Sequence, residues 1–165
     1  MDQDAVAVAT GLRGALTSSG LSQATRGAGL VVAATTTTQP YVELDWLDPD
    51  AVFVNVSLDD ATEGLLLGTD LLLVDDWSIV STDSHRLLGR LTQAGRVTAP
   101  GTPAPPNGRA VSADLGIVLS GQFPHPAVGA RVVINPFGAG THDVALATKI
   151  YQRALETGIG TWLPR

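Results

Sequence analysis

Two adjacent aspartates, Asp59 and Asp60, offer the clearest acid–base chemistry in the sequence, because they follow a short apolar stretch at 52–56. Carboxylates this close can raise each other's pKa, which would make one of them a general base. In a second interpretation, either aspartate caps a helix that starts near Ala61 and interacts with the helix dipole. The local pattern leaves both interpretations open.

A glycine-rich turn is the second candidate for a binding site. Residues 135–143 (NPFGAGTHD) lie between an apolar stretch and a long helical pattern. Glycine allows a ligand to approach the backbone, and the amides at a helix start attract anions, although two glycines could equally make a plain tight turn. His142 lies beside this turn, where it could join Asp59 in a polar pocket or simply be exposed at the helix start.

Other polar residues are weaker candidates for a phosphate-binding or metal-binding site. Four consecutive threonines at 35–38 could line phosphate groups with hydroxyls, or could simply end a strand. Asp75 and Asp76 could bind Mg²⁺, but the spacing supplies no third carboxylate, and we therefore predict no metal site. The sequence contains no cysteine, which excludes a disulfide, a zinc–thiolate site and a cysteine nucleophile.

The elements that must position these residues alternate between strand and helix patterns. Short apolar stretches rich in β-branched residues predict four strands buried on both faces, at 30–34, 52–56, 71–74 and 131–134. Helical patterns are found at 22–27, 84–93, 114–120 and 144–155. Thr141 or Asp143 is expected to cap the last helix and Gly158 to end it. The segment 4–17 fits a helix better than a short strand, and 97–108 is too rich in proline and glycine for regular structure.

This alternation predicts an α/β fold in which a mostly parallel sheet has flanking helices, formed by residues 1–165 as a single domain. Ligands bind outside the carboxyl ends of parallel strands. We therefore expect Thr36, Asp60 and His142 to border one pocket.

The charge and the apolar runs of the sequence argue against nucleic-acid and membrane partners. The chain carries 16 acidic and 10 basic residues, so it has no basic field to attract the phosphates of a nucleic acid. The longest apolar runs, such as 71–74, are too short to span a membrane, and the acidic start at 1–4 does not resemble a secretory signal. We expect a cytoplasmic protein that acts on a small molecule.

An ordered set of short segments also recurs in a known family. The segments are Arg26–Thr36 (RGAGLVVAATT), 53–60 (FVNVSLDD), 72–77 (LLVDDW), 115–121 (LGIVLSG) and 135–138 (NPFG), followed by Asp143. Together, over residues 20–165, they resemble the ornithine cyclodeaminase/mu-crystallin family. The NVSL and NPFG variants are most similar to the branch of amino-acid dehydrogenases that helps make 2,3-diaminopropionate.

The resemblance implies a Rossmann-type NAD domain and chemistry at the α-carbon of an amino acid. Family members oxidise the amine to an imine by hydride transfer to NAD. The catalytic aspartate of the family falls on Asp60. The positions implied beside the cofactor are Thr35, Thr36, Thr37, Asn55, Ser57, Pro136, Phe137 and Gly138.

The chain departs from the family in its length and its start. Family members are longer, and their N-terminal half supplies a dimerisation domain and the Arg and Lys residues that hold the substrate carboxylate. No Gly-x-Gly-x-x-Gly motif precedes Val31, and Pro136 stands where the family usually has serine. We expect a truncated Rossmann-like domain that lacks the first βαβ unit.

Three functions follow from these expectations. The first is a shortened cyclodeaminase-like enzyme for an amine, an imine or another amino-acid-derived substrate of specialised biosynthesis, acting with or without NAD. The others are a subunit of a split enzyme and a binding protein without catalysis. Without the first βαβ unit, the strand at 30–34 would have unpaired backbone groups that can pair with another chain. We therefore expect a homodimer or an obligate heteromer with a chain that supplies the missing half.

Overall fold

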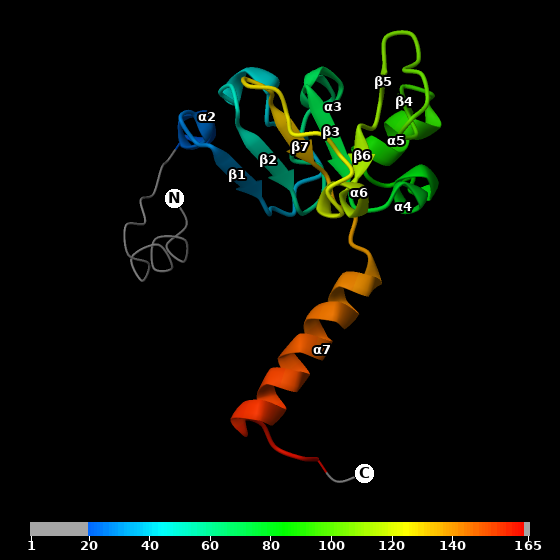
Figure 1. The fold of residues 1–165 in the computed structure, drawn as a ribbon. Coiled ribbons are helices and arrows are strands. Elements are labelled where there is room, and N and C mark those ends of the chain that lie inside the picture. The colour runs from blue at the N-terminus through cyan, green and yellow to red at the C-terminus, as the bar shows by residue number, and fades with distance from the viewer. Residues whose placement is uncertain (1–19, 164–165) are drawn as a thin grey trace.

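Five parallel strands form the sheet at the centre of the molecule (Figure 1). The computed structural model describes residues 20–163, so the helix predicted at 4–17 lies outside the described residues. In spatial order the strands are β1 (Leu30–Ala33), β2 (Val52–Asn55), β7 (Val132–Ile134), β3 (Leu71–Val74) and β6 (Ala113–Asp114). Every neighbouring pair is parallel, which confirms the predicted α/β fold with a mostly parallel sheet.

Helices precede the first described strand, occupy most connections between strands and follow the last strand. They are α2 (Leu21–Thr25), the 3-10 helix η1 (Leu44–Trp46), α3 (Glu63–Gly68), α4 (Trp77–Thr82), α5 (Leu87–Gln93), α6 (Leu115–Leu119) and α7 (Gly140–Thr157). The short helices predicted at α2 and α6 are confirmed. The helix predicted at 84–93 starts only with α5, because the carboxylate of Asp83 accepts the amide hydrogens of His85 and Arg86 and holds both residues in a turn.

The prediction that 97–108 lacks regular structure is wrong at its first residues. The short strand β4 (Val97–Thr98) pairs in parallel with β5 (Arg109–Ala110) outside the main sheet. Gly108 makes this pairing possible, because a Cβ atom at this position would lie 2.1 Å from the carbonyl oxygen of Arg96.

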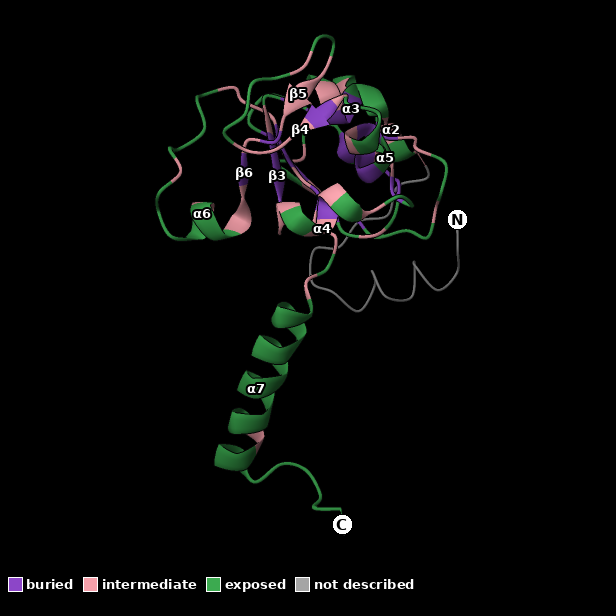
Figure 2. Ribbon diagram, turned by 90° about the vertical axis from the view of Figure 1, so that its right-hand side faces the viewer, coloured by how far each residue is buried: buried purple, intermediate pink, exposed green. Residues whose placement is uncertain are grey.

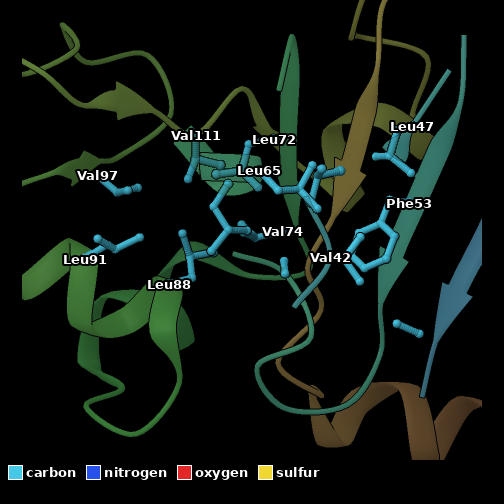
Figure 3. Close-up of a cluster of buried hydrophobic side chains, with 14 of the residues drawn as sticks. Val42, Leu47, Phe53, Leu65, Leu72, Val74, Leu88, Leu91, Val97 and Val111 are labelled. Carbon is cyan, nitrogen blue, oxygen red and sulfur yellow. The ribbon is translucent and has the colours of Figure 1, made fainter. Parts of the chain in front are cut away.

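Most of the hydrophobic core lies on one face of the sheet, beneath α3 and α5 (Figure 3). Phe53, Leu72 and Val133 from three neighbouring strands are completely buried there. Leu65 of α3 and Leu88 of α5 cover them from the helix side. This cluster fixes β2, β7 and β3, and predicted site residues follow β2 and β7.

The opposite face of the sheet is covered much less completely. Its buried cluster consists of Leu73, Ala113 and Val132, against which α6 packs. On the edge strand β1, Leu30 and Val32 are 62% and 56% exposed. The prediction of burial on both faces is therefore wrong for β1, because no described element covers Leu30 and Val32 on this face of the sheet.

The last helix, α7, extends away from the sheet and its residues are almost all exposed (Figures 1 and 2). Gly158 ends it in a left-handed conformation with φ of 68°, as predicted. The predicted caps at Thr141 and Asp143 are wrong, because the helix already starts at Gly140 and its N-cap, Ala139, has no side-chain hydrogen bond to offer. In the described part of the chain, no helix is long and apolar enough to cross a membrane.

Candidate functional site

The carboxyl ends of β1, β2 and β7 lie side by side and bring several predicted site residues to one edge of the sheet. The amide nitrogen of Asn55, at the end of β2, donates a hydrogen bond of 3.1 Å to Oδ1 of Asn135, directly after β7. Both side chains are buried, with 2% of their surface exposed. The two strand ends are thus joined by a side-chain contact between residues that are far apart in the sequence.

Asp60 lies at the centre of this edge and is completely buried. Its Oδ1 accepts hydrogen bonds from the hydroxyls of Thr35 at 2.7 Å and Tyr41 at 3.0 Å. Its Oδ2 is buried too but has no hydrogen-bond partner among the described residues. A buried carboxylate oxygen is costly to leave unpaired. One oxygen is therefore held in place, and the other is left without a donor.

Tyr41 is a site residue that the sequence analysis missed. Burial, together with the hydrogen bond and negative charge of Asp60, raises the pKa of Tyr41 to about 12. The phenol is consequently protonated at neutral pH and remains a donor to Asp60. One feature of the sequence could have pointed to Tyr41. It lies three residues after the threonine run that follows the strand predicted at 30–34.

The threonine loop is organised mainly by its own hydrogen bonds. The hydroxyl of Thr35 accepts from the amide of Thr37 at 3.1 Å, while donating to Asp60. The hydroxyl of Thr37 bonds to the backbone of Gln39 on both its donor and acceptor sides. Thr36 is exposed. The loop thus holds Asp60 through one hydroxyl and leaves Thr36 at the surface.

Asp59 does not cap the helix that follows it. That helix, α3, starts at Glu63, and its cap is Thr62, whose hydroxyl accepts the amide hydrogen of Leu65 at 3.2 Å. Asp59 instead accepts the amide hydrogen of Leu87 at 2.7 Å, at the start of α5. The capping interpretation is therefore wrong for α3, and Asp59 ties the end of β2 to α5.

Arg86 is a second site residue that the sequence analysis missed. Only 9% of it is exposed, and its guanidinium group lies between the loops that follow β2 and β7. Burial lowers the pKa of Arg86, although surrounding aspartates, Asp59 first, favour its charged form. No local motif marks it, because the hydrogen-bond partners of its guanidinium group are all distant in the sequence.

The glycine-rich turn is held by an aspartate of the same chain. Asp75, at the end of β3, accepts the amide hydrogens of Phe137 at 3.0 Å and Gly138 at 2.7 Å. Gly138 has a φ of 91°, which favours glycine. These two amides are therefore occupied by a carboxylate and do not form an anion site. The neighbouring Asp76 caps α4 through the amide of Ser78.

His142 is not brought to Asp60. It is exposed on the first turn of α7, whereas the side chain of Asp60 is buried against Thr35 and Tyr41. A groove of about 550 Å³ runs beside β1, and Thr35 and Tyr41 line part of it, but His142 does not. The predicted shared pocket is therefore incomplete within the described residues. These residues also include no group of three or more His, Cys, Asp or Glu side chains that could hold a metal ion.

Comparisons with known proteins support the resemblance. The family model described as the ornithine cyclodeaminase/mu-crystallin family matches residues 12–158. N-((2S)-2-amino-2-carboxyethyl)-L-glutamate dehydrogenase from Staphylococcus aureus (strain NCTC 8325 / PS 47) is 30% identical over 135 residues, which are 81% of this chain and 37% of that protein. The crystal structure of CmnK is also 30% identical, with a TM-score of 0.75, and the match covers 89% of this chain and 42% of CmnK.

More distant structures share the fold. Thermococcus litoralis Δ(1)-pyrroline-2-carboxylate reductase, in complex with NADH and L-proline, is 19% identical with a TM-score of 0.66, covering 87% of this chain and 43% of its own. An archaeal alanine dehydrogenase dimer with bound NAD is 19% identical with a TM-score of 0.70, covering 98% of this chain and 48% of its own. The chain thus spans less than half the length of each of these relatives. The extent of the family match shows that the chain belongs to the ornithine cyclodeaminase/mu-crystallin family.

Proposed function

We propose that this chain carries the NAD-binding edge and the proton-transferring carboxylate of an enzyme that acts on an amino-acid-derived amine or imine. The observation that carries the proposal is the state of Asp60, whose Oδ1 is held by Thr35 and Tyr41 while its buried Oδ2 has no partner among the described residues. The S. aureus relative is a dehydrogenase of an amino-acid derivative, in agreement with this chemistry.

The role of Asp60 follows from its surroundings. Two hydroxyl donors fix the orientation of the carboxylate through Oδ1. Oδ2 would accept a proton from a substrate ammonium group, so that an N–H bond breaks and an O–H bond forms. The same negative charge would stabilise an iminium cation. Because Asp60 has no exposed surface, a change of loop conformation must bring the carboxylate into contact with the substrate.

The residues present fit the nicotinamide end of NAD. Asn55 has a buried Oδ1 without a partner in the described structure, and Gly138 has open space where a side chain would project. We propose that the cofactor lies against Thr35, Thr36, Thr37, Asn55, Ser57, Pro136, Phe137 and Gly138. NAD would supply the acceptor for the hydride of the substrate α-carbon. The sequence has no Gly-x-Gly-x-x-Gly motif for the diphosphate, and we propose that another chain or segment binds it.

A partner chain is the second part of the proposal. Leu30 and Val32 expose an apolar sheet edge, and α7 exposes Val144, Ile150 and Leu155. Apolar surface on this scale indicates an interaction site. A homodimer or an obligate heteromer, in which the other chain supplies the remaining half of the enzyme and the substrate-binding cations, would bury it. His142, next to this surface, and Asp59 are the polar residues we propose closest to the substrate.

Calorimetric titration with NAD and with NADP, in the presence and absence of amino acids, tests the cofactor. Binding in the micromolar range (on the order of −8 kcal/mol) supports the proposal. No heat with either nucleotide contradicts NAD binding and favours a role without this cofactor.

Asp60→Asn tests the carboxylate, because it retains the shape of the side chain and removes its basicity. We expect turnover to be lost while the unfolding midpoint changes little. Asp76→Asn is the matched control, because Asp76 caps α4 through the amide of Ser78, and we expect its loss to lower stability but to retain turnover. Full activity in Asp60→Asn would exclude the assignment.

A further inference from the structure

We propose that Arg86 is the positioning residue that holds the loops after β2 and β7 together as one binding edge. The consequence for nucleotide binding rests on the proposed function, whereas the effect on the loops does not depend on it. Neither the family match nor the sequence motifs point to this residue. The inference rests on the contacts of its guanidinium group.

The guanidinium group bonds to acceptors of both loops. In the loop after β2, Nη2 donates to the carbonyl oxygens of Asn55 at 3.3 Å and Leu58 at 3.1 Å. In the loop after β7, Nη1 donates to the carbonyl oxygen of Pro136 at 2.6 Å, and Nη2 donates to Oδ1 of Asn135 at 2.9 Å. The rigid, planar fork of arginine can reach all four acceptors at once, which the single ammonium group of lysine cannot do.

The same side chain supports the glycine-rich turn. The guanidinium carbon lies 4.3 Å from the ring centre of Phe137, at the distance of a cation–π contact. From the other side, Asp75 accepts the amide hydrogens of Phe137 and Gly138. The turn is thus held between Arg86 and Asp75, so that a loss of Arg86 leaves it attached on one side alone.

Burial indicates that Arg86 acts through the loops and is not a ligand for phosphate or carboxylate. Arg86 is 9% exposed, and both Nη1 and Nη2 donate to acceptors of the protein, while the buried Nε has no partner among the described residues. Four aspartates, Asp59, Asp60, Asp75 and Asp83, surround it and favour its positive charge. Removing the guanidinium group would take this donor from the carbonyl oxygen of the buried Asn55 and from that of Pro136, at the edge where we propose that NAD binds.

Arg109 provides a matched control at the opposite edge of the sheet. It is also a partly buried arginine, and burial lowers the pKa of its guanidinium group. It donates to the carbonyl oxygens of Thr69 at 2.5 Å and Leu66 at 3.3 Å, before the start of β3. Replacing Arg109 removes the same kind of interaction without touching the loops after β2 and β7.

Hydrogen exchange on the full chain tests the loops directly, with Arg86→Met and Arg109→Met compared. We expect Arg86→Met to increase exchange about tenfold or more in 55–59 and 135–138, in line with the loss of charged hydrogen bonds. Arg109→Met should increase exchange near 66–70 and leave the two loops unchanged. Arg86→Lys should give an intermediate effect and also serves if Arg86→Met fails to fold.

NADH titration of the same variants tests the consequence. We expect the dissociation constant to rise about tenfold or more in Arg86→Met, less in Arg86→Lys, and not at all in Arg109→Met at similar stability. Unchanged loop exchange in a folded Arg86→Met chain, or equal effects of Arg86→Met and Arg109→Met on the loops, would overturn the inference. Absence of NADH binding to the unsubstituted chain would instead contradict the proposed function, and loop exchange would still decide the role of Arg86.

Discussion

The two faces of the sheet differ in how completely they are buried. On one face Phe53, Leu72 and Val133 have no exposed surface, and α3 and α5 pack over them. On the other face Leu30 and Val32 of β1 are more than half exposed. Burial of apolar surface is the main favourable contribution to folding. The first face therefore holds the strands together, and the second retains apolar surface available to a partner.

The same difference separates two helices. In α5, Leu88 and Leu91 are buried against the covered face. In α7, Ile150 and Leu155 belong to an equally clear apolar stripe but are 60% and 51% exposed. An apolar stripe on a helix therefore does not by itself decide whether the helix packs against its own chain.

The largest expected effect is on the covered face. Phe53→Ala should lower the free energy of unfolding by about 3–5 kcal/mol, because it leaves a cavity in the main core. Val54→Ala, at the next residue on the opposite face, should cost only about 1 kcal/mol, because Val54 is partly exposed. Urea unfolding followed by fluorescence measures both. Equal losses would show that the two faces contribute equally.

Substitution on the open face should change association more than folding. Val32→Glu introduces a charge on the bare edge strand and should raise the dissociation constant of the assembly about tenfold or more. The stability of the single chain should change by about 0.5 kcal/mol or less. The matched control is Leu119→Glu, at an 85% exposed leucine of α6. Sedimentation velocity separates the two outcomes, and an equal effect of Leu119→Glu would argue against the β1 edge.

The helix ends allow a smaller comparison. Thr62→Ala removes the cap of the packed helix α3 and should lower the global stability by about 1 kcal/mol. Gly158→Ala places an L side chain in a left-handed conformation, which costs about 1–2 kcal/mol, but only at the end of α7. The urea midpoint should therefore fall for Thr62→Ala alone. A fall for Gly158→Ala in the unassembled chain would show that α7 contributes to the cooperative fold.

The smallest expected effect is a titration at high pH. The pKa of Tyr41 is raised from 10.0 to about 12, so its contribution to stability is present below pH 10 and is lost as the pH rises toward 12. In a Tyr151→Phe background Tyr41 is the single tyrosine, and its absorbance near 295 nm reports its ionisation. Adding Asp60→Asn should lower this pKa part of the way, since burial, the largest cause, persists. No change would mean that the charge and hydrogen bond of Asp60 do not act on Tyr41.

Local sequence patterns determined the individual elements well. The apolar stretch at 71–74 coincides with β3, and Gly158 ends α7 as its position after a helical pattern indicates. These predictions succeed because strand burial and helix ends depend on neighbouring residues. The family segments likewise directed attention to Asp60 and Thr35, which the structure joins by a hydrogen bond.

The tertiary structure alone decided how these elements and side chains combine. The last strand, β7, lies between β2 and β3, and no local pattern specifies that order. Arg86 contacts residues 28 to 50 positions away, and Tyr41 reaches Asp60 across 19 positions. Periodicity records which side of an element is apolar, whereas a buried polar contact depends on the three-dimensional meeting of distant segments. For that reason the sequence by itself determined the strands and the central carboxylate, and only the folded chain showed the tyrosine and the arginine that hold the site in place.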